Sequence, residues 1–311
     1  IGGVCFLGAC VWPFIGRGFN RPYLGAFIGL LWFFMPNNLC AIFIEGNLAR
    51  SLSMIFLPVF IYSVYKYLYN HKLRYIPLMV FTFLLMELCH LGYAGMAAIA
   101  VIIYGIVYMI QKGRKKAVLD VVISMIFGFM LLGIWLVASL RGGITSLDNS
   151  ENMANFFQNL WITINPFERL TRGFEYFYFG FAALVVIVFG ILFGYKKSRT
   201  GFVTGFIILL MTTKSAYAVL KHLPGSQYLW MLRFISIALC MILMSFLMWD
   251  RLKKTLVLML CVLLVVDTIP SLSLIVGEHN DISVQERMAA RQDSTLISSA
   301  QAVTKQRLAL M

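Results

Sequence analysis

Residues 75–116 read YIPLMVFTFLLMELCHLGYAGMAAIAVIIYGIVYMIQKGRKK, and this stretch decides the fold class. It holds two apolar runs, 76–91 and 93–110, which meet at a tight turn near 90–93 and end in a basic cluster. Each run is close to the length of about 17 to 20 apolar residues that a helix needs to cross a bilayer. The stretch therefore predicts two transmembrane helices joined by a short turn at one side of a membrane.

The composition of the whole chain also indicates a membrane protein. Of its 311 residues, 60% are hydrophobic and 13% are charged. A soluble domain is usually about half apolar and about a quarter charged. The excess apolar surface needs lipid as its solvent, which excludes a soluble enzyme that only touches a membrane.

Apolar runs of similar length recur along the chain and predict about ten membrane helices. They cover residues 1–15, 23–43, 51–69, 76–91, 93–110, 118–139, 176–194, 201–217, 231–249 and 255–271. The predicted fold class is all-α, a polytopic transmembrane helix bundle that occupies residues 1–271. An aromatic and charged segment at 140–175 is expected to lie in the outer membrane interface. Residues 272–311 are expected to begin an external soluble segment.

The basic residues fall in five short linkers at alternate helix ends. These linkers hold Arg17 and Arg21; Lys66, Lys72 and Arg74; Lys112, Arg114, Lys115 and Lys116; Lys196, Lys197 and Arg199; and Arg251, Lys253 and Lys254. Cytoplasmic loops carry an excess of Lys and Arg, so this side is predicted to face the cytoplasm and the C-terminal tail to lie outside. The net charge of +13 is then a topology signal in the cytoplasmic (cell) membrane, and no nucleic-acid partner is expected.

The two ends of the chain indicate a piece of a longer protein. Ile1 already belongs to an apolar run, with no basic segment before it, and the chain stops at Met311 without a terminating signal. We therefore expect that an N-terminal part and an external C-terminal domain are missing.

A polar cluster interrupts the apolar pattern on the predicted outer side, at Glu45-Gly46-Asn47-Leu48-Ala49-Arg50. Gly46 permits a tight turn, and Asn47 is suited to cap the helix that follows. The guanidinium of Arg50 offers a planar fork for phosphate oxygens beside a helix N-terminus. These residues fit either the floor of a phosphate-binding pocket or an ordinary interfacial turn with a Glu–Arg pair.

Three further ionisable residues lie inside apolar segments near the same side. Glu87 and His90 are three positions apart, which places both on one face of a helix. They fit a proton-handling or substrate-binding pair, or an interhelical hydrogen bond. Arg233 fits an anion clamp, or a side chain that reaches the lipid headgroups. Arg50, His90 and Arg233 are predicted to line one cavity that opens to the outer leaflet, with Glu87 lining or supporting it.

Several kinds of chemistry have no motif in this chain. There is no Walker loop, GxSxG, HExxH or dinucleotide fingerprint. The four His are far apart and the six Cys form no CxxC pair, so no zinc site and no disulfide are expected. No cofactor is evident, although a divalent metal beside Glu45 stays open.

The segment MPNNLCAIFIEGNLARSLSMIFLPVFIYSVYKY, residues 35–67, resembles a family of large bacterial membrane proteins described as 6-pyruvoyl-tetrahydropterin synthase-related. The shared features are a GN-x-x-R element ending at Arg50, a helix with Pro58, a helix ending in His90, and Arg233 at a later helix start. These proteins are similar in layout to the GT-C class of membrane glycosyltransferases, which use polyprenyl-phosphate-linked sugars at the outer membrane face. The acidic residue that this class places in its first outer loop would precede Ile1.

The resemblance implies a membrane glycosyltransferase whose partners are membrane lipids and a polyprenyl-phosphate sugar donor. Arg50 and Arg233 would hold the donor phosphate, Glu45 would assist a metal or the acceptor, and His90 would orient the phosphate or the acceptor. The catalytic base would lie in the missing part. The alternatives are a transporter or flippase of lipid-linked or anionic substrates, and a non-catalytic envelope scaffold.

Overall fold

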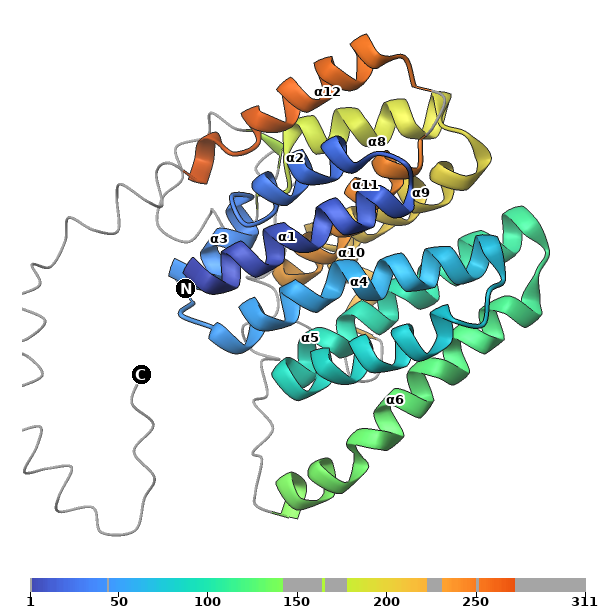
Figure 1. Ribbon diagram of the computed structural model, residues 1–311. Helices are drawn as coiled ribbons and strands as arrows, with labels where there is room; N and C mark the ends of the chain where they lie inside the picture. Colours follow the sequence, from blue (N-terminus) through green and yellow to red (C-terminus); the bar gives the residue numbers. More distant parts are fainter. Residues whose placement is uncertain are drawn as a thin grey trace, which may run out of the picture.

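The computed structural model describes residues 2–43, 45–141, 164–165, 178–222, 231–249 and 252–271. Within these residues the chain is helical and holds no β-strand (Figure 1). The elements are α1 (Gly2–Gly18), α2 (Pro22–Trp32), α3 (Pro36–Phe43), α4 (Leu48–Asn70), α5 (Tyr75–Lys112), α6 (Lys115–Arg141), α8 (Phe181–Phe193), α9 (Lys196–Met211), α10 (Lys214–Leu220), η4 (Met231–Arg233), α11 (Phe234–Met248) and α12 (Lys254–Val266). The predicted all-α fold class is confirmed. Most of the predicted interfacial segment 140–175 and all of 272–311 lie outside the described residues.

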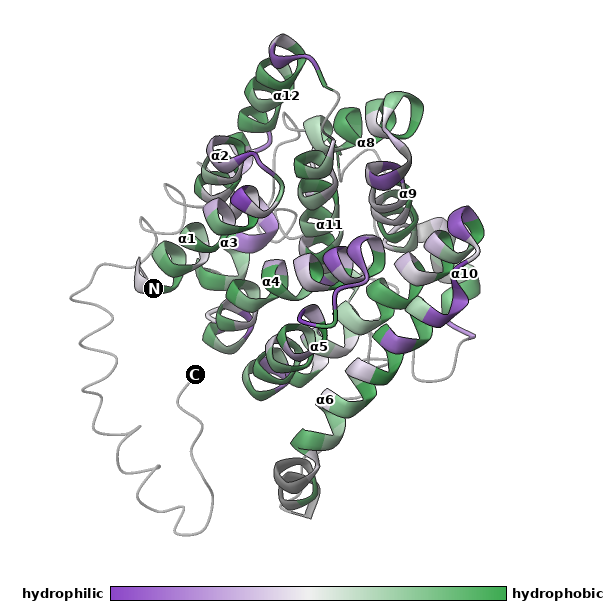
Figure 2. Ribbon diagram, turned by 45° about the vertical axis from the view of Figure 1, so that its right-hand side comes forward, coloured by the Kyte–Doolittle hydropathy of each residue, from purple (hydrophilic) through white to green (hydrophobic). Residues whose placement is uncertain are grey.

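Four helices of the described part are long and apolar enough to cross a membrane, by length and composition. These spans are Leu48–Asn70, Tyr75–Lys112, Lys115–Gly133 and Lys254–Ser271. The pair α2 and α3 adds a fifth if it counts as one broken span. Figure 2 shows that the helices are largely hydrophobic and that hydrophilic residues gather at the connections. The predicted count of about ten membrane helices is not reached among these residues and stays a prediction.

Helix α5 doubles back on itself at His90, whose backbone angles of φ −154° and ψ 93° are not helical. Tyr62 and Tyr65 lie one turn apart on α4. The ring centres of Tyr62 and Tyr75 are 6.1 Å apart, and those of Tyr65 and Tyr104 are 4.4 Å apart. A straight helix would hold Tyr75 and Tyr104 about 44 Å apart. The chain therefore forms two antiparallel arms, 75–89 and 91–112, with the reversal where the sequence predicts a tight turn (Figure 1).

Two predicted helices are broken in the structure. The segment 23–43 bends by 46° between α2 and α3. Pro36 opens α3, and a residue that precedes proline is disfavoured in helical conformation, so the break falls at Met35. The segment 201–217 is interrupted at Thr212 and Thr213, whose hydroxyls donate to the carbonyls of Leu209 and Leu210 and so compete with the helix.

Helix α11 lies in the middle of the bundle and is buried along residues 234–247. It packs against α9, α4, α5 and α8. The sequence predicts a membrane helix at 231–249. Helix α11 is apolar on all sides, and such a helix suits the interior of a protein as well as a membrane. Arg233 lies at the N-terminal end of α11. The central position of α11 brings this residue close to the turn before α4 and to the break in the middle of α5.

The basic linkers gather at one end of the bundle, on the right of Figure 1. Lys66 donates to the carbonyl of Gly18, and Arg114 contacts His71. The hydroxyl of Tyr69 donates to the carbonyl of Lys197 at 2.9 Å, which brings the linker before α9 to the same end. The linkers of the described residues thus share one end, as the alternating pattern predicts, and the turn at 45–50 lies at the other.

Candidate functional site

The turn between α3 and α4 is built by two residues that the sequence singles out. Gly46 has a φ of +58°, a left-handed conformation that glycine adopts without steric cost. Asn47 is the N-cap of α4, and its side-chain oxygen accepts from the amide of Arg50 at 2.9 Å. Both predictions about the local structure of this turn are confirmed. The turn fixes the first residues of α4, so that Arg50 enters the bundle.

The guanidinium of Arg50 is fully buried and held on two sides. Its Nη1 donates to Oε1 of Glu45 at 2.5 Å, and its Nη2 donates to Oδ1 of Asn37 at 2.8 Å. Its Cζ also lies 5.8 Å from the ring centre of Tyr93. A charge without solvent is tolerated only when it is paired and hydrogen-bonded, and α3 and the turn before α4 together supply that pairing.

Arg233 approaches the same carboxylate from the start of α11. Its Nη2 lies 3.9 Å from Oε2 of Glu45, and its Nη1 lies 3.3 Å from Nε2 of His90. Its side chain is 13% exposed, whereas that of Arg50 is 0% exposed. Arg233 is therefore the arginine of this pair that an incoming molecule reaches.

His90 acts as the N-cap of the second arm of α5. Its Nδ1 accepts from the amide of Tyr93, three residues on, at 3.2 Å, which is the geometry of a capping side chain. An accepting Nδ1 assigns the proton of a neutral imidazole to Nε2. Nε2–H and the guanidinium of Arg233 then face each other as two hydrogen-bond donors.

Tyr93 and Ser236 tie the two sides of the cluster together. The hydroxyls of Tyr93 and Ser236 lie 2.8 Å apart, and the hydroxyl of Ser236 donates to the carbonyl of Arg233 at 3.0 Å. This link fixes the second arm of α5 against the start of α11. It holds His90 and Arg233, which lie far apart in the sequence, at a set separation.

The structure thus brings together Glu45, Arg50, His90 and Arg233, which we call the arginine cluster. The cluster holds two guanidinium groups and one carboxylate, so with a neutral imidazole its net charge is positive. Asn47 contributes as a cap, through its contact with the amide of Arg50.

Glu87 does not join the arginine cluster. It lines a separate cavity between the two arms of α5 and α6. The expectation that Glu87 and His90 share a helix face rests on regular helical geometry, and that geometry ends at His90. The break turns the imidazole toward Arg233 and leaves Glu87 on the arm before it.

Sequence reasoning missed Asn37, Tyr93 and Ser236, although each holds a member of the arginine cluster. Asn37 and Asn38 form a fully buried amide pair inside an apolar stretch. Buried amides need hydrogen-bond partners, so two adjacent asparagines in an apolar stretch are the sequence signal that could have indicated a partner for Arg50. Nothing in the sequence distinguishes Tyr93 or Ser236 from other hydroxyls in apolar segments.

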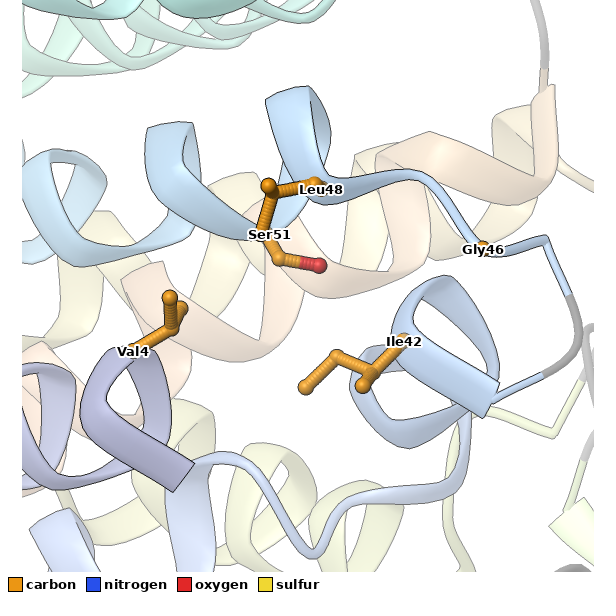
Figure 3. Close-up of a pocket in the computed structure, with 5 residues that line it drawn as sticks. All are labelled: Val4, Ile42, Gly46, Leu48 and Ser51. Atoms are coloured by element: carbon orange, nitrogen blue, oxygen red, sulfur yellow. The ribbon is translucent and has the colours of Figure 1, made fainter. Parts of the chain in front are cut away.

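An apolar cavity of about 290 Å³ lies next to the turn that carries Glu45 (Figure 3). It is lined by Val4 of α1, Ile42 of α3, and Gly46, Leu48 and Ser51 around the start of α4. Figure 3 shows the side chains of Val4 and Ile42 beside this space, below the first turn of α4. A charged cluster and an apolar hollow thus adjoin the same turn.

The described residues include no group of three or more His, Cys, Asp or Glu side chains placed to hold a metal ion. The six cysteines are free thiols. A pterin-type zinc centre needs clustered His ligands, and the His residues of the described part do not supply them.

Three comparisons with known proteins bear on this arrangement. The family model described as "6-pyruvoyl-tetrahydropterin synthase related domain; membrane protein" matches residues 1–275. Comparison with curated proteins and with solved structures found no match. The matched region includes every helix of the described fold and every residue of the arginine cluster. The chain therefore belongs to the 6-pyruvoyl-tetrahydropterin synthase related domain family of membrane proteins.

Proposed function

We propose that this membrane protein is a glycosyltransferase similar to the GT-C class, which takes a sugar from a polyprenyl phosphate at the outer face of the cytoplasmic membrane. The arginine cluster is the place where the donor phosphate binds. The observation that carries this proposal is the contact of 3.3 Å between Nη1 of Arg233 and Nε2 of His90. Both groups are donors in the tautomer in which Nδ1 of His90 accepts from the amide of Tyr93. A phosphate oxygen beside both groups accepts from both and relieves their mutual repulsion.

The charge and position of the cluster support an anionic lipid headgroup. Two guanidinium groups share one carboxylate, so the cluster has a positive excess that a phosphate neutralises. It lies at the end of the bundle opposite the basic linkers, which is the outer side under the positive-inside rule. The apolar cavity beside Gly46 offers hydrocarbon-compatible space next to it, as a substrate with a charged head and an isoprenoid chain requires.

The geometry divides the roles of the two arginines. Both Nη atoms of Arg50 are engaged by Glu45 and Asn37, so Arg50 is a positioning residue that holds the carboxylate. Arg233 and His90 are the groups that contact the phosphate. Glu45 orients Arg233 from the far side, and we assign no catalytic base among these residues.

Binding of a polyprenyl monophosphate to the purified full chain in lipid nanodiscs tests the proposed phosphate site. Arg233→Gln is expected to weaken binding about 10- to 100-fold, because a hydrogen bond to a charged group contributes about 1.5–3 kcal/mol. The matched control is Arg17→Gln, which removes one exposed cation at the basic end. Equal affinities of the Arg233→Gln variant and the unchanged protein would remove the phosphate site.

Transfer itself needs a second measurement. Vesicles that contain the protein are supplied with a polyprenyl-phosphate-linked radiolabelled hexose and with a cell-envelope extract as the source of an acceptor hydroxyl. The release of polyprenyl phosphate and the movement of the label to the acceptor are followed together. A glycosyltransferase breaks the bond between sugar and phosphate, whereas a transporter of lipid-linked substrates moves the donor across the membrane intact. Movement of intact donor without release would favour the transporter.

A further inference from the structure

The cavity that contains Glu87 is a second candidate site, distinct from the arginine cluster. It has a volume of about 380 Å³ and lies between the two arms of α5 and α6. Phe83, Gly95 and Ile102 of α5 and Val122, Met125 and Phe129 of α6 are among the apolar residues that line it. Ile102 and Phe129 are also partly exposed on membrane-spanning helices, so the cavity opens toward lipid. Its volume is within the range of small-molecule sites, at the lower end.

Among the described residues that line this cavity, Glu87 is the one with a polar side chain, and one of its carboxyl oxygens lacks a hydrogen-bond partner. The residue is 2% exposed, and its buried Oε2 has no hydrogen-bond partner among the described residues. Asp267 is a buried carboxylate for comparison, and it accepts from the hydroxyl of Tyr178 and from the amides of Ala182 and Ala183. A buried carboxyl oxygen without a hydrogen-bond partner costs free energy, so Oε2 sets Glu87 apart from a carboxyl with a structural role such as Asp267.

We propose that this cavity binds a lipophilic amine, with Glu87 as the group that pairs with the nitrogen. In apolar surroundings the carboxyl is most stable as the neutral acid, which is a hydrogen-bond donor. A neutral amine that enters from the lipid takes the carboxyl proton, and the product is a hydrogen-bonded ammonium–carboxylate pair with no net charge. Hydrogen bonds between ionised groups are about twice as strong as neutral ones, which favours an amine over a neutral acceptor.

Dicyclohexylcarbodiimide, a lipid-soluble reagent for carboxylic acids, tests the site in the full chain in vesicles. The O–H of the carboxyl adds across one C=N bond: the oxygen bonds to the central carbon, and the proton goes to nitrogen. The acyl group then migrates to nitrogen, so the peptide gains the whole mass of the reagent and nothing leaves. Mass spectrometry is expected to find the adduct on Glu87 and not on Asp267. Glu87→Gln should remove it, because a carboxamide does not react.

Three molecules of similar shape then identify the ligand class by protection from labelling. N-Methyldicyclohexylamine carries the basic nitrogen, dicyclohexyl ketone carries a neutral acceptor, and 1,1-dicyclohexylethane is the hydrocarbon. The amine is expected to slow labelling of Glu87 at least tenfold at a concentration at which the other two have little effect. Equal protection by the hydrocarbon or by the ketone would overturn the amine site, and so would an absence of labelling of the unchanged protein.

A cavity-filling variant tests the location without changing Glu87. A Cβ added at Gly95 meets no atom within 4 Å, so Gly95→Leu extends into open space at the cavity. Gly133 on α6 has the same freedom and does not line this cavity, so Gly133→Leu is the matched control. Labelling is expected to fall at least tenfold in Gly95→Leu and to be unchanged in Gly133→Leu. Equal labelling of both variants would place the reactive carboxyl outside this cavity. Failure here leaves the phosphate site untouched, because that site is measured with different residues and a different ligand.

Discussion

Arg50 and Arg233 share one carboxylate: Oε1 of Glu45 lies 2.5 Å from Nη1 of Arg50, and its Oε2 lies 3.9 Å from Nη2 of Arg233. The shared contact joins the turn before α4 to the start of α11. The two arginines differ in environment, since Arg50 is enclosed by its partners and Arg233 is partly exposed. This asymmetry makes Arg50 a support for the carboxylate and Arg233 the accessible cation.

Glu45→Gln is expected to destabilise the protein by about 3–5 kcal/mol, because the fully buried guanidinium of Arg50 loses its counter-charge. Thermal unfolding in detergent measures the change. The double variant Glu45→Gln with Arg50→Met is the control, and it should recover much of the loss, since no uncompensated charge remains. A single variant as stable as the unchanged protein would show that Glu45 does not compensate Arg50.

Arg50→Lys should weaken both stability and phosphate binding more than its unchanged charge suggests. Arg50 reaches Glu45 and Asn37 with two separate Nη atoms, and the single ammonium of lysine cannot reproduce this fork. We expect a loss of about 1–3 kcal/mol in unfolding free energy from the buried partner left unsatisfied. Parallel measurement of Asn37→Ala, which removes one of the two contacts, should give a smaller loss. The reverse order would contradict the assignment of Arg50 as a two-sided support.

Gly46→Ala is expected to cost about 1–2 kcal/mol, because a left-handed conformation at φ +58° brings Cβ close to the following carbonyl. An added Cβ has no neighbour within 4 Å, so steric contact with other residues does not contribute. Gly95→Ala is the matched control, since its Cβ also meets open space but its backbone is helical. That variant should be neutral or slightly stabilising, as alanine is favoured over glycine inside helices. Equal effects of the two variants would rule out backbone strain at Gly46.

Cysteine labelling can determine on which side of the membrane each end of the bundle lies. In a variant without native cysteines, Leu48→Cys should react with a membrane-impermeant maleimide in intact cells, because Leu48 is 56% exposed at the end opposite the basic linkers. Lys115→Cys should react only after the cells are permeabilised, since it lies in a basic linker. The opposite pattern would reverse the predicted topology and place the arginine cluster on the cytoplasmic side.

The sequence by itself determined the helical membrane character, the turn near His90, the cap at Asn47 and the gathering of basic linkers at one end. These features depend on local chemistry or on the count of apolar runs, both of which can be read along the chain. The candidate residues Glu45, Arg50, His90 and Arg233 were also visible, because charges inside apolar segments are costly and therefore conspicuous.

Only the tertiary structure decided which of these residues meet and how they are shared. Helix rotation and packing put Asn37, Tyr93 and Ser236 around the arginines, and such long-range contacts leave no periodic trace in a sequence. The break at His90 sent the imidazole toward Arg233 and left Glu87 in a cavity of its own, because the three-residue spacing rule holds only while the helix is regular. Local propensity fixes where a helix begins and bends, whereas the packing of whole helices fixes what its side chains face.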